Sequence, residues 1–585
     1  MPIAGQKNIL ITSALPYVNN VPHLGNIIGS VLSADVFSRY CKVRNINSLY
    51  VCGTDEYGTA IETKALEEGV SPQEICDKYY QIHSDIYQWF DIGFDYFGRS
   101  ATHKQTEITQ AIFMALHNNG YIEQKSEEQL FCPNPKHERF LADRFVEGIC
   151  PVCAYPDARG DQCDKCGSLL DPMQLGEPRC KIDGVTPIPR HTTHCYIRLD
   201  LLQPKVEEFV AQTSTTWSSN AVAITQSWLK QGLNSRSITR DLKWGVPVPL
   251  EGFEDKVFYV WFDAPIGYIS ITANYTDAGV EGGQEWKRWW LPKPETDVKL
   301  YQFMGKDNVP FHTVLFPASL LGTEQDWTKL HQISTTGRFF QGESSSLEYL
   351  QYEGDKFSKS RGVGVFGDQA KFTGQSSSVF RYYLLSSRPE TSDSQFLWRE
   401  FITKHNTELL NNLGNLVNRV TKFLNTKYHS TVPDYTKDTS DTAGTKKLET
   451  FVNEKLAEYI RQMDRLKLKE GLKLAMDISM QLNFFLQDNK LDNNLFNNFP
   501  DRCAATIGAA VNGIYLLSAM LSPFIPATSD SIDQQINAPR LAVPDSWRVG
   551  DVLPGHTIGK PAYLFKRIDE SEEEEWKSKF GGSTR

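Results

Sequence analysis

The first 55 residues alternate between apolar runs and a helical pattern, and this alternation constrains the fold more than any other feature. Asn8 to Ala14 is a nearly continuous apolar run, of the kind that a buried parallel strand shows. A turn at Pro16 leads into a helical pattern from His23 to about Cys41. Ser48 to Cys52 is a second strand-like run, and it ends in Gly53-Thr54-Asp55. Strand, helix and strand in this order predict a βαβ unit and a parallel sheet.

The second half of that sheet is expected far downstream. Strand-like runs return at Lys256 to Phe262 and at Val298 to Met304, each followed by turn residues and then a helix. These runs predict an α/β, Rossmann-type, doubly wound domain. Because a long insert separates its halves, this domain is discontinuous in sequence.

The rest of the chain predicts further domains, since 585 residues are too many for one core and indicate three to four domains. The insert carries the paired cysteines. From about residue 391, long stretches with a period of 3.6 residues predict an all-α domain: Phe401 to Lys427, Thr445 to Leu468, Gly471 to Gln487 and Cys503 to Leu521. Ser571 to Glu575 predicts a solvated tail. We expect a split α/β domain at 1–120 and 236–390 and an insert at 121–235. A helical domain at 391–560 and a C-terminal segment with a tail at 561–585 are expected to follow.

Composition and charge narrow the class of protein. The net charge of -10 argues against a general nucleic-acid coat, so any RNA must be held by local basic patches. No leader-like segment stands at the N-terminus, and eleven cysteines in so long a chain indicate a reducing compartment. We therefore expect the cytoplasm. Ile507 to Pro526 is apolar enough to suggest a membrane span, but its polar residues and the lack of charged anchors favour a buried bundle helix.

Two motifs suit a polyphosphate. His23-Leu24-Gly25-Asn26 opens a helix directly after a strand, where the helix N-terminus favours anions and Gly25 permits close approach. Lys356-Phe357-Ser358-Lys359-Ser360 is a cationic loop, bounded by glycines, that can close over phosphates as charge develops on them. Taken singly, the first is an ordinary helix junction and the second a solvated basic turn.

The cysteine pairs predict a metal site. Cys150 and Cys153 form one CxxC unit, and Cys163 and Cys166 form a second. Two such units supply the four thiolates of a tetrahedral structural Zn²⁺ site. A redox CxxC is the competing interpretation, but two in tandem favour one structural zinc. A second site at Cys132, His137 and Cys180 is the weaker interpretation of those residues, because only three candidates are present at irregular spacing.

Together, the two phosphate motifs closely resemble the His-Ile-Gly-His and Lys-Met-Ser-Lys-Ser signatures of class I aminoacyl-tRNA synthetases. This chain departs from the pattern at Asn26, where the family has His. The segments Val260 to Tyr268 (VWFDAPIGY) and Ala14 to Tyr17 (ALPY) narrow the resemblance to the methionyl-tRNA synthetase family. Without this resemblance, the aromatic side chains of these segments would be interpreted as part of the hydrophobic core.

The resemblance implies roles for individual residues. Catalysis is expected from His23, Asn26, Lys356 and Lys359, and ATP binding from the same four with Gly25, Lys306 and Asp307. Methionine binding is expected from Leu15, Tyr17, Asp55, Arg240, Trp261, Ala264, Pro265, Tyr268 and His312. Asn415 and Arg419, one helical turn apart, and Leu491 are expected to meet the tRNA anticodon. At the position aligned with Leu491, bacterial members have a stacking Trp. An insertion, Gly337 to Leu347, departs from the family pattern.

The fold and activity implied by the resemblance are those of a methionine-tRNA ligase. The fold class is an α/β Rossmann-type catalytic domain with a zinc-knuckle insert, followed by an all-α anticodon-binding domain. ATP with Mg²⁺ activates methionine to methionyl-adenylate, which is transferred to initiator and elongator methionine tRNA. Further expected partners are proteins that deliver tRNA or gather synthetases, and no membrane is expected. The rivals are a Leu, Ile or Val ligase, a small nucleotidylyltransferase, and a catalytically impaired tRNA-binding or regulatory homologue.

Overall fold

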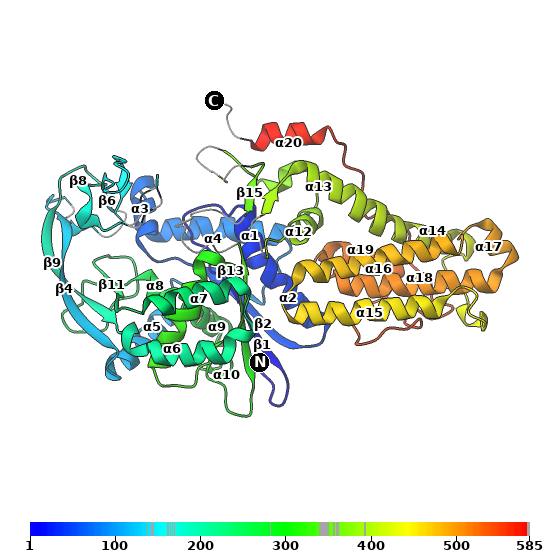
Figure 1. Ribbon diagram of the computed structural model, residues 1–585, viewed down its shortest axis with the longest axis horizontal. Coiled ribbons are helices and arrows are strands. Elements are labelled where there is room, and N and C mark those ends of the chain that lie inside the picture. The colour runs from blue at the N-terminus through cyan, green and yellow to red at the C-terminus, as the bar shows by residue number, and fades with distance from the viewer. Residues whose placement is uncertain are drawn as a thin grey trace. The chain divides into compact units, whose positions relative to one another are not determined.

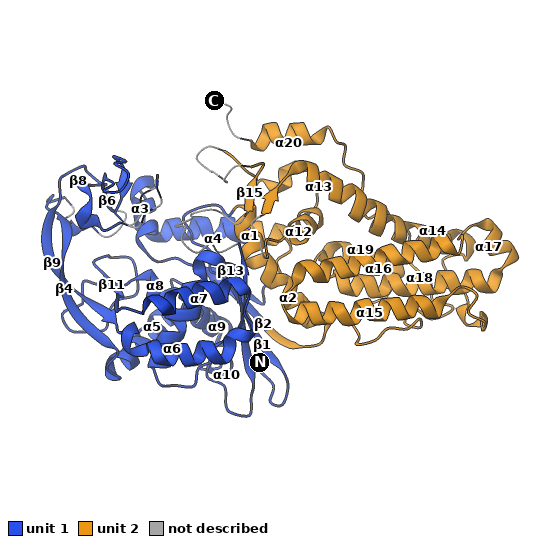
Figure 2. Cartoon of the chain, in the orientation of Figure 1, with its two compact units in different colours: residues 1–22, 49–85, 94–348 blue, residues 23–48, 86–93, 349–585 orange. Residues whose placement is uncertain are grey.

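The chain forms two compact units in this computed structural model (Figure 2). The structure describes residues 1–585 apart from 137, 142–144, 161–162, 164, 167, 169, 281, 338–349, 355–356, 358–361, 391–393 and 582–585. The first unit comprises residues 1–22, 49–85 and 94–348, and the second comprises 23–48, 86–93 and 349–585. The expected insert, 121–235, falls inside the first unit. The domain bounds expected from the sequence stay a prediction.

A five-stranded sheet forms the centre of the first unit, with strand order β14-β13-β1-β2-β3. Figure 1 labels three of these strands, β13, β1 and β2. The strands are β1 (Asn8–Ser13), β2 (Asn47–Thr54), β3 (Tyr96–Arg99), β13 (Val298–Gly305) and β14 (Leu330–Thr336). β1 is buried along its whole length and pairs in parallel with β13, from Asn8 opposite Val298 to Ser13 opposite Phe303. A continuous apolar run buried on both faces is what a central parallel strand requires. The three strands predicted at β1, β2 and β13 are confirmed.

Helices of the first unit pack the sheet into one apolar core. Trp289, Trp290, Ile269 and Phe316 are among its buried members. The helices of this unit are α3 (Thr59–Glu68), α4 (Pro72–Trp89, of which 72–85 belong to this unit), α5 (His103–Asn118), α6 (Leu199–Thr213), α7 (Ser219–Gln231), α9 (Gly267–Thr276), α10 (Lys287–Trp290) and α11 (Phe316–Gly322).

The insert is built on a long antiparallel ladder. β4 (Ile122–Cys132) pairs with β9 (Ile188–Ile197), from Ile122 opposite Ile197 to Phe131 opposite Ile188. β5 (Arg139–Phe140) and β10 (Arg236–Ser237) extend this sheet. A smaller sheet of β7 (Ala158–Arg159), β6 (Val146–Ile149) and β8 (Gly176–Cys180) adjoins the cysteine pairs.

One predicted strand is wrong. Lys256 to Phe262 was expected in the parallel sheet, but only Val257–Phe258 (β12) is extended, and it pairs antiparallel with β11 (Thr239–Arg240). The chain then turns into α8 (Val260–Asp263), where the Ala264 N–H bonds to the Val260 carbonyl. A short apolar run cannot be separated from a buried helical turn by its periodicity alone, and tertiary contacts decide it.

The second unit is mainly helical, and the predicted long helices are confirmed. It contains α1 (Leu24–Gly29), α2 (Val31–Val43), α12 (Ser377–Ser386), α13 (Trp398–Lys404), a π-helix (His405–Gly414), α14 (Asn415–Lys427), α15 (Thr445–Asp464), α16 (Leu468–Asp488), α17 (Asn493–Asn498), α18 (Pro500–Leu521) and α19 (Pro526–Ile536). Two short strands, β15 (Leu350–Tyr352) and β16 (Ser394–Phe396), pair in parallel. Among the described residues, α18 is the one helix long and apolar enough to cross a membrane, and its apolar window is fully buried. This agrees with the predicted bundle helix.

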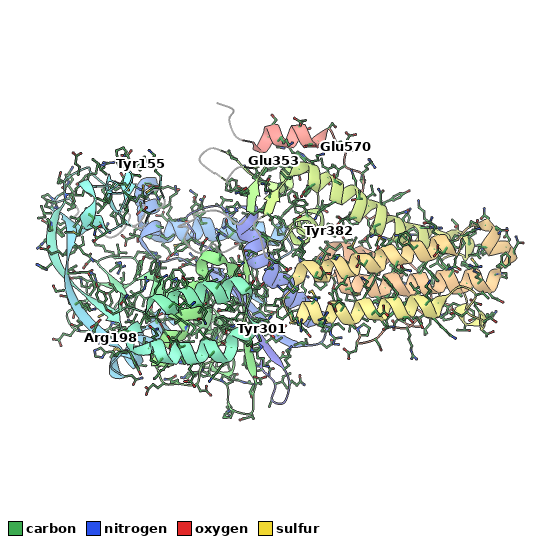
Figure 3. All side chains as sticks on the ribbon, viewed as in Figure 1. Tyr155, Arg198, Tyr301, Glu353, Tyr382 and Glu570 are labelled. Carbon is green, nitrogen blue, oxygen red and sulfur yellow. The ribbon has the colours of Figure 1, made fainter. Side chains whose placement is uncertain are left out.

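The acidic stretch Ser571 to Glu575 is exposed or half-buried as expected, but the residues after it are not all solvated. Glu572–Phe580 forms α20, whose four glutamates stand in its first turn, where the helix dipole favours negative charge. Trp576 and Phe580, four residues apart, are buried on one side of the helix, with ring centroids 4.8 and 5.8 Å from that of Trp398. Lys577 lies 3.8 Å from Glu353, which is labelled near α20 (Figure 3). Charge composition predicted solvation, but the apolar pair at helical spacing determines the packing.

Candidate functional site

The carboxyl ends of three adjacent parallel strands carry the first group of expected site residues. Leu15 and Tyr17 follow β1, Asp55 follows β2, and Lys306 follows β13. In the order β14-β13-β1-β2-β3 the winding direction reverses between β13 and β1. Ligands of open α/β sheets bind outside the strand ends at such a reversal.

Asp55 is a buried carboxylate held beside Tyr17. Its backbone N–H donates to the Pro16 carbonyl at 2.9 Å, and its carbonyl accepts from the Val18 N–H at 3.3 Å. Burial raises the pKa of Asp55 well above its usual range and the nearby Asp263 carboxyl raises it further, against the lowering effect of Tyr57 and Tyr17. One Asp55 oxygen is buried without a partner among the described residues. A cationic group, such as an α-ammonium, suits that oxygen.

Tyr268 and His312 form a fixed hydrogen-bonded pair. His312 Nδ1 lies 2.7 Å from the Asn308 carbonyl oxygen, which can only accept, so Nδ1 carries the proton. His312 Nε2 is then the acceptor for the Tyr268 hydroxyl at 2.7 Å. Burial lowers the pKa of His312 to about 4, so the ring is neutral at pH 7. The pair is an uncharged polar wall, which suits a thioether side chain better than a charged one.

The segment from Trp261 to Tyr268 contains further residues that are expected to bind methionine. Pro265 and Tyr268 are buried and Ala264 is half-buried, whereas Trp261 is 39% exposed. The Trp261 ring lies edge-on to Phe311 at 5.1 Å. A Cβ on Gly267 would lie 2.8 Å from Leu15 Cδ1, so glycine there allows α9 to approach the end of β1.

Arg240 and the Lys306-Asp307 pair complete the expected residues of this unit. The Arg240 guanidinium carbon lies 3.8 Å from the centroid of the Tyr259 ring, and Nη1 donates to Ser237 Oγ at 2.9 Å. Lys306 is buried and Asp307 is exposed, both in a 3-10 turn (Lys306–Asn308) directly after β13.

In the second unit, His23, Gly25 and Asn26 form a reciprocal helix cap. His23 Nδ1 accepts from the Gly25 N–H at 3.0 Å, and Asn26 Oδ1 accepts from the His23 N–H at 3.1 Å. Burial lowers the pKa of His23 to about 4, so its Nε2 carries the proton and is a neutral donor. A Cβ on Gly25 would lie 2.7 Å from His23 Cε1. Glycine is therefore required by the cap itself.

The two phosphate motifs meet through an aromatic contact. The His23 and Phe357 rings stack with centroids 4.7 Å apart and planes 13° apart. A Cβ on Gly364 would lie 2.3 Å from the Phe357 ring, so the loop glycine makes room for that ring. The predicted residues Lys356 and Lys359 lie outside the described residues, as does nearly all of the insertion Gly337 to Leu347.

The four cysteines of the insert fit one tetrahedral metal ion. The Sγ atoms of Cys150 and Cys166 lie 3.8 Å apart, those of Cys153 and Cys163 lie 3.6 Å apart, and all four lie within 4.8 Å of one another. Thiolates about 2.3 Å from Zn²⁺ at tetrahedral corners are separated by about 3.8 Å. The Val152 N–H points at Cys150 Sγ at 3.4 Å, and the Tyr155 carbonyl, in the residue labelled in Figure 3, accepts from the Cys150 N–H. The donor set therefore fits a closed structural zinc.

Cys132 and Cys180 also lie together, with Asp183 as the third group. Cys132 Sγ is 3.6 Å from an Asp183 oxygen, which also accepts from the Asn134 amide at 2.5 Å. His137, the third residue considered in the sequence, lies outside the described residues.

The expected anticodon residues lie on and beside α14. Asn415 is exposed and Arg419 is half-buried, one turn apart. Arg419 Nη2 lies 3.5 and 3.4 Å from the carbonyl oxygens of Leu486 and Leu491. The Leu491 side chain is only 7% exposed, so it offers little surface for base stacking.

Comparison with known proteins identifies the family. Residues 9–421 match the sequence model described as "tRNA synthetases class I (M)", and residues 433–585 match "Anticodon binding domain of methionyl tRNA ligase". The chain belongs to the methionyl-tRNA synthetase family. Over its whole length it is 59% identical to the probable cytoplasmic methionine–tRNA ligase of Schizosaccharomyces pombe and 56% identical to the cytoplasmic methionine–tRNA ligase of Saccharomyces cerevisiae. It covers 72% and 74% of those proteins.

A solved structure supports the fold of this methionyl-tRNA synthetase family member. A Mycobacterium tuberculosis methionyl-tRNA synthetase in complex with methionyl-adenylate matches with a TM-score of 0.76 at 20% identity, covering 96% of this chain and 100% of that one. At this identity the likeness establishes the fold. The roles of individual residues remain proposals.

Two residues next to the expected set were missed in the sequence. Asp263 stands inside the quoted synthetase segment, and both its carboxylate oxygens are buried without a partner among the described residues. Phe357 stands between Lys356 and Ser358 and contacts His23. The only sign of these two residues in the sequence was their position within a motif. The burial of Asp263 and the ring contact of Phe357 cannot be deduced from the sequence.

Proposed function

We propose that this chain is a cytoplasmic methionine-tRNA ligase that uses ATP with Mg²⁺. The observation that carries this is identity of 59% and 56% to two cytoplasmic methionine–tRNA ligases over the whole chain. The Asp55 carboxylate and the neutral Tyr268–His312 wall suit the two ends of methionine. The alternative of a catalytically impaired tRNA-binding homologue is not favoured by any described residue.

In the proposed reaction, a methionine carboxylate oxygen attacks the α-phosphorus of ATP. The bond from that phosphorus to the bridging oxygen breaks, and pyrophosphate leaves with the electron pair. A ribose hydroxyl of the terminal adenosine of methionine tRNA then attacks the carbonyl carbon of methionyl-adenylate, and AMP leaves. We assign Asp55 to the α-ammonium and Arg240 to the carboxylate. Leu15, Tyr17, Trp261, Ala264, Pro265, Tyr268 and His312 are assigned to the side chain.

We assign the phosphates to His23, Gly25, Asn26, Lys306, Asp307, Lys356 and Lys359. The neutral His23 ring presents an Nε2 proton, and the lysines supply positive charge. Mg²⁺ would neutralise the charge on ATP when bound. Asn415, Arg419 and Leu491 are assigned to the anticodon, and both initiator and elongator methionine tRNA are expected substrates. Proteins that deliver tRNA or gather synthetases are further expected partners.

The test is methionine-dependent exchange of pyrophosphate into ATP, followed by charging of methionine tRNA. Both should occur with the parent. Lys359→Ala should slow exchange by about 10²- to 10³-fold, because one contact to developing transition-state charge is lost. Methionine affinity should change little. Exchange at the parental rate in Lys359→Ala would remove this lysine from the site, and absence of exchange in the parent would favour the tRNA-binding alternative.

A further inference from the structure

α14 presents a single polar stripe beyond the two expected anticodon residues. Asn415, Arg419, Lys422 and Thr426 follow one another at spacings of four, three and four residues, so they share one face of the helix. The opposite face is buried through Leu416, Val417, Val420, Thr421 and Leu424. Lys422 is exposed, one turn beyond Arg419.

Lys422 holds an exposed aromatic ring on this stripe. Its Nζ donates to the Tyr563 hydroxyl at 2.8 Å and lies 4.4 Å from the centroid of the Tyr563 ring. Tyr563 is 69% exposed, the highest value among the exposed large hydrophobic and aromatic side chains of the described residues. Most of the ring surface is therefore accessible to a ligand.

The segment that carries Tyr563 is anchored without it. The Asn406 amide donates to the Ile568 carbonyl at 2.9 Å and its oxygen accepts from the Ile568 N–H at 3.0 Å. Phe565 is buried against His405, and His405 Nε2 lies 2.7 Å from the Lys566 carbonyl oxygen. An exposed ammonium–hydroxyl contact adds little to such an anchor. Tyr563 is therefore better explained by a ligand than by packing.

The chemistry of the stripe matches single-stranded RNA. Exposed cations accompany the ring: Lys422 on α14 and Lys560, Lys566 and Arg567 on the segment. The last three lie within four residues of Tyr563 in sequence, in a chain of net charge -10. Cationic groups that follow a backbone, with an aromatic ring for a base, are the recurring means of holding unpaired nucleotides. Leu491 is aliphatic and buried, so it does not serve as a stacking ring.

We propose that Tyr563 and Lys422 extend the RNA-reading face of α14 to the anticodon loop of tRNA. The Tyr563 ring stacks on an unpaired base, and the Lys422 ammonium contacts the adjacent phosphate. This inference rests on the proposed function and adds two residues to its tRNA surface. It also places the stacking platform on the C-terminal segment.

The experiment measures binding of an RNA hairpin with the anticodon stem and loop of methionine tRNA to the full chain. Tyr563→Ala should raise the Kd by about 5- to 100-fold, the usual worth of one stacked base. Tyr563→Phe keeps the ring and should bind like the parent. Lys422→Gln should reduce the dependence of log Kd on log salt by about 0.7. Pyrophosphate exchange should be unchanged in all three.

Two controls separate stacking from a structural effect. Phe372→Ala removes a ring that is 57% exposed and also lies beside a lysine, with Lys371 Nζ 5.5 Å from its centroid, and it should not change hairpin binding. The second control uses a set of hairpins, each lacking one base of the loop. The hairpin that lacks the stacked base should bind Tyr563→Ala and the parent equally. If Tyr563→Ala binds like the parent, if Tyr563→Phe is equally weak, or if no such hairpin exists, the proposal is wrong. A parent without exchange or hairpin binding would instead refute the proposed function.

Discussion

At the scale of single residues, the site depends on groups kept neutral by burial. His23 and His312 are both neutral, because burial lowers the pKa of each to about 4. Each has one ring nitrogen fixed by a backbone group, the Gly25 N–H for His23 and the Asn308 carbonyl for His312. Their hydrogen-bonding roles are therefore set before any ligand binds, which lowers the cost of ordering the complex.

Changes at Tyr268 should separate its ring from its hydroxyl. Tyr268→Ala opens the pocket and removes the donor to His312, and we expect the KM for methionine to rise about 10- to 200-fold with ATP affinity nearly unchanged. Tyr268→Phe keeps the ring and should have the smaller effect. Steady-state exchange kinetics with methionine and ATP varied in turn measure both. Parental methionine affinity in Tyr268→Ala would show that the ring is only core.

Asp263 should make stability depend on pH. Burial raises its pKa from 3.8 to about 7, against the partial opposition of the Gln105 side chain. Between about pH 4 and pH 7 the folded state therefore holds a proton that the unfolded state has lost, so stability falls as pH rises through this window. Asp263→Asn cannot ionise, and it should be more stable than the parent above pH 7 by on the order of a few kcal/mol.

Unfolding of the parent and of Asp263→Asn at pH 5 and pH 8 checks this sign. The free energy of unfolding of Asp263→Asn should exceed that of the parent by more at pH 8 than at pH 5. Asp255→Asn, at an exposed position, should have the same pH dependence of stability as the parent. Asp55 is present in all three proteins, and the Asp263 carboxyl raises its pKa further, so Asp263→Asn also lowers the pKa of Asp55 and adds to the difference in the same direction. Parallel pH profiles would contradict the assignment.

At the scale of elements, α8 and α20 show where local sequence patterns mislead. Lys256 to Phe262 is rich in β-forming residues, yet only Val257–Phe258 is extended and the last three residues, from Val260, are helical. Ser571 to Glu575 is acidic, yet the helix it begins is fixed by Trp576 and Phe580 against Trp398. For α20, the contact with Trp398, distant in sequence, determines which side of the helix is buried.

Removal of the Trp576 side chain should detach α20. Trp576→Ala leaves a cavity against Trp398, and a buried Trp lost to Ala typically costs about 3–5 kcal/mol. We expect limited proteolysis to cleave between residues 570 and 581 in this variant at a much higher rate. The exposed Glu575→Ala, in the same helix, is the matched control and should be cleaved like the parent. Equal cleavage of the two variants would mean that other contacts hold α20.

At the scale of the whole molecule, the zinc site offers the clearest stoichiometric test. The purified chain should contain one equivalent of zinc, and Cys163→Ser should contain none, because four thiolates close the coordination shell. Metal analysis measures both, and Cys76→Ser, at a buried cysteine outside the cluster, should keep its zinc. Two equivalents in the parent would point to Cys132, Cys180 and Asp183 as a second site.

The sequence predicted the elements that bury a continuous apolar face. β1, β2, β13, α15, α16 and α18 follow from their periodicity alone. The sequence also predicted the cluster of four cysteines from Cys150 to Cys166, because the spacing of two CxxC units is typical of a zinc knuckle. It did not predict the stack of His23 on Phe357 or the burial of Asp263, because these depend on how segments hundreds of residues apart pack. The assignments of methionine and tRNA came from resemblance.

The pairing of β1 with β13 has a consequence for synthesis on the ribosome. Thr12 and Gln302 bond across these strands although 290 residues separate them. At a translation rate of about 5 to 20 residues per second, β13 is synthesised on the order of 15 to 60 s after β1. An apolar strand with one unpaired edge attracts other chains during that delay. Slower translation between β2 and β13 therefore lengthens the time during which Asn8–Ser13 can pair with another chain.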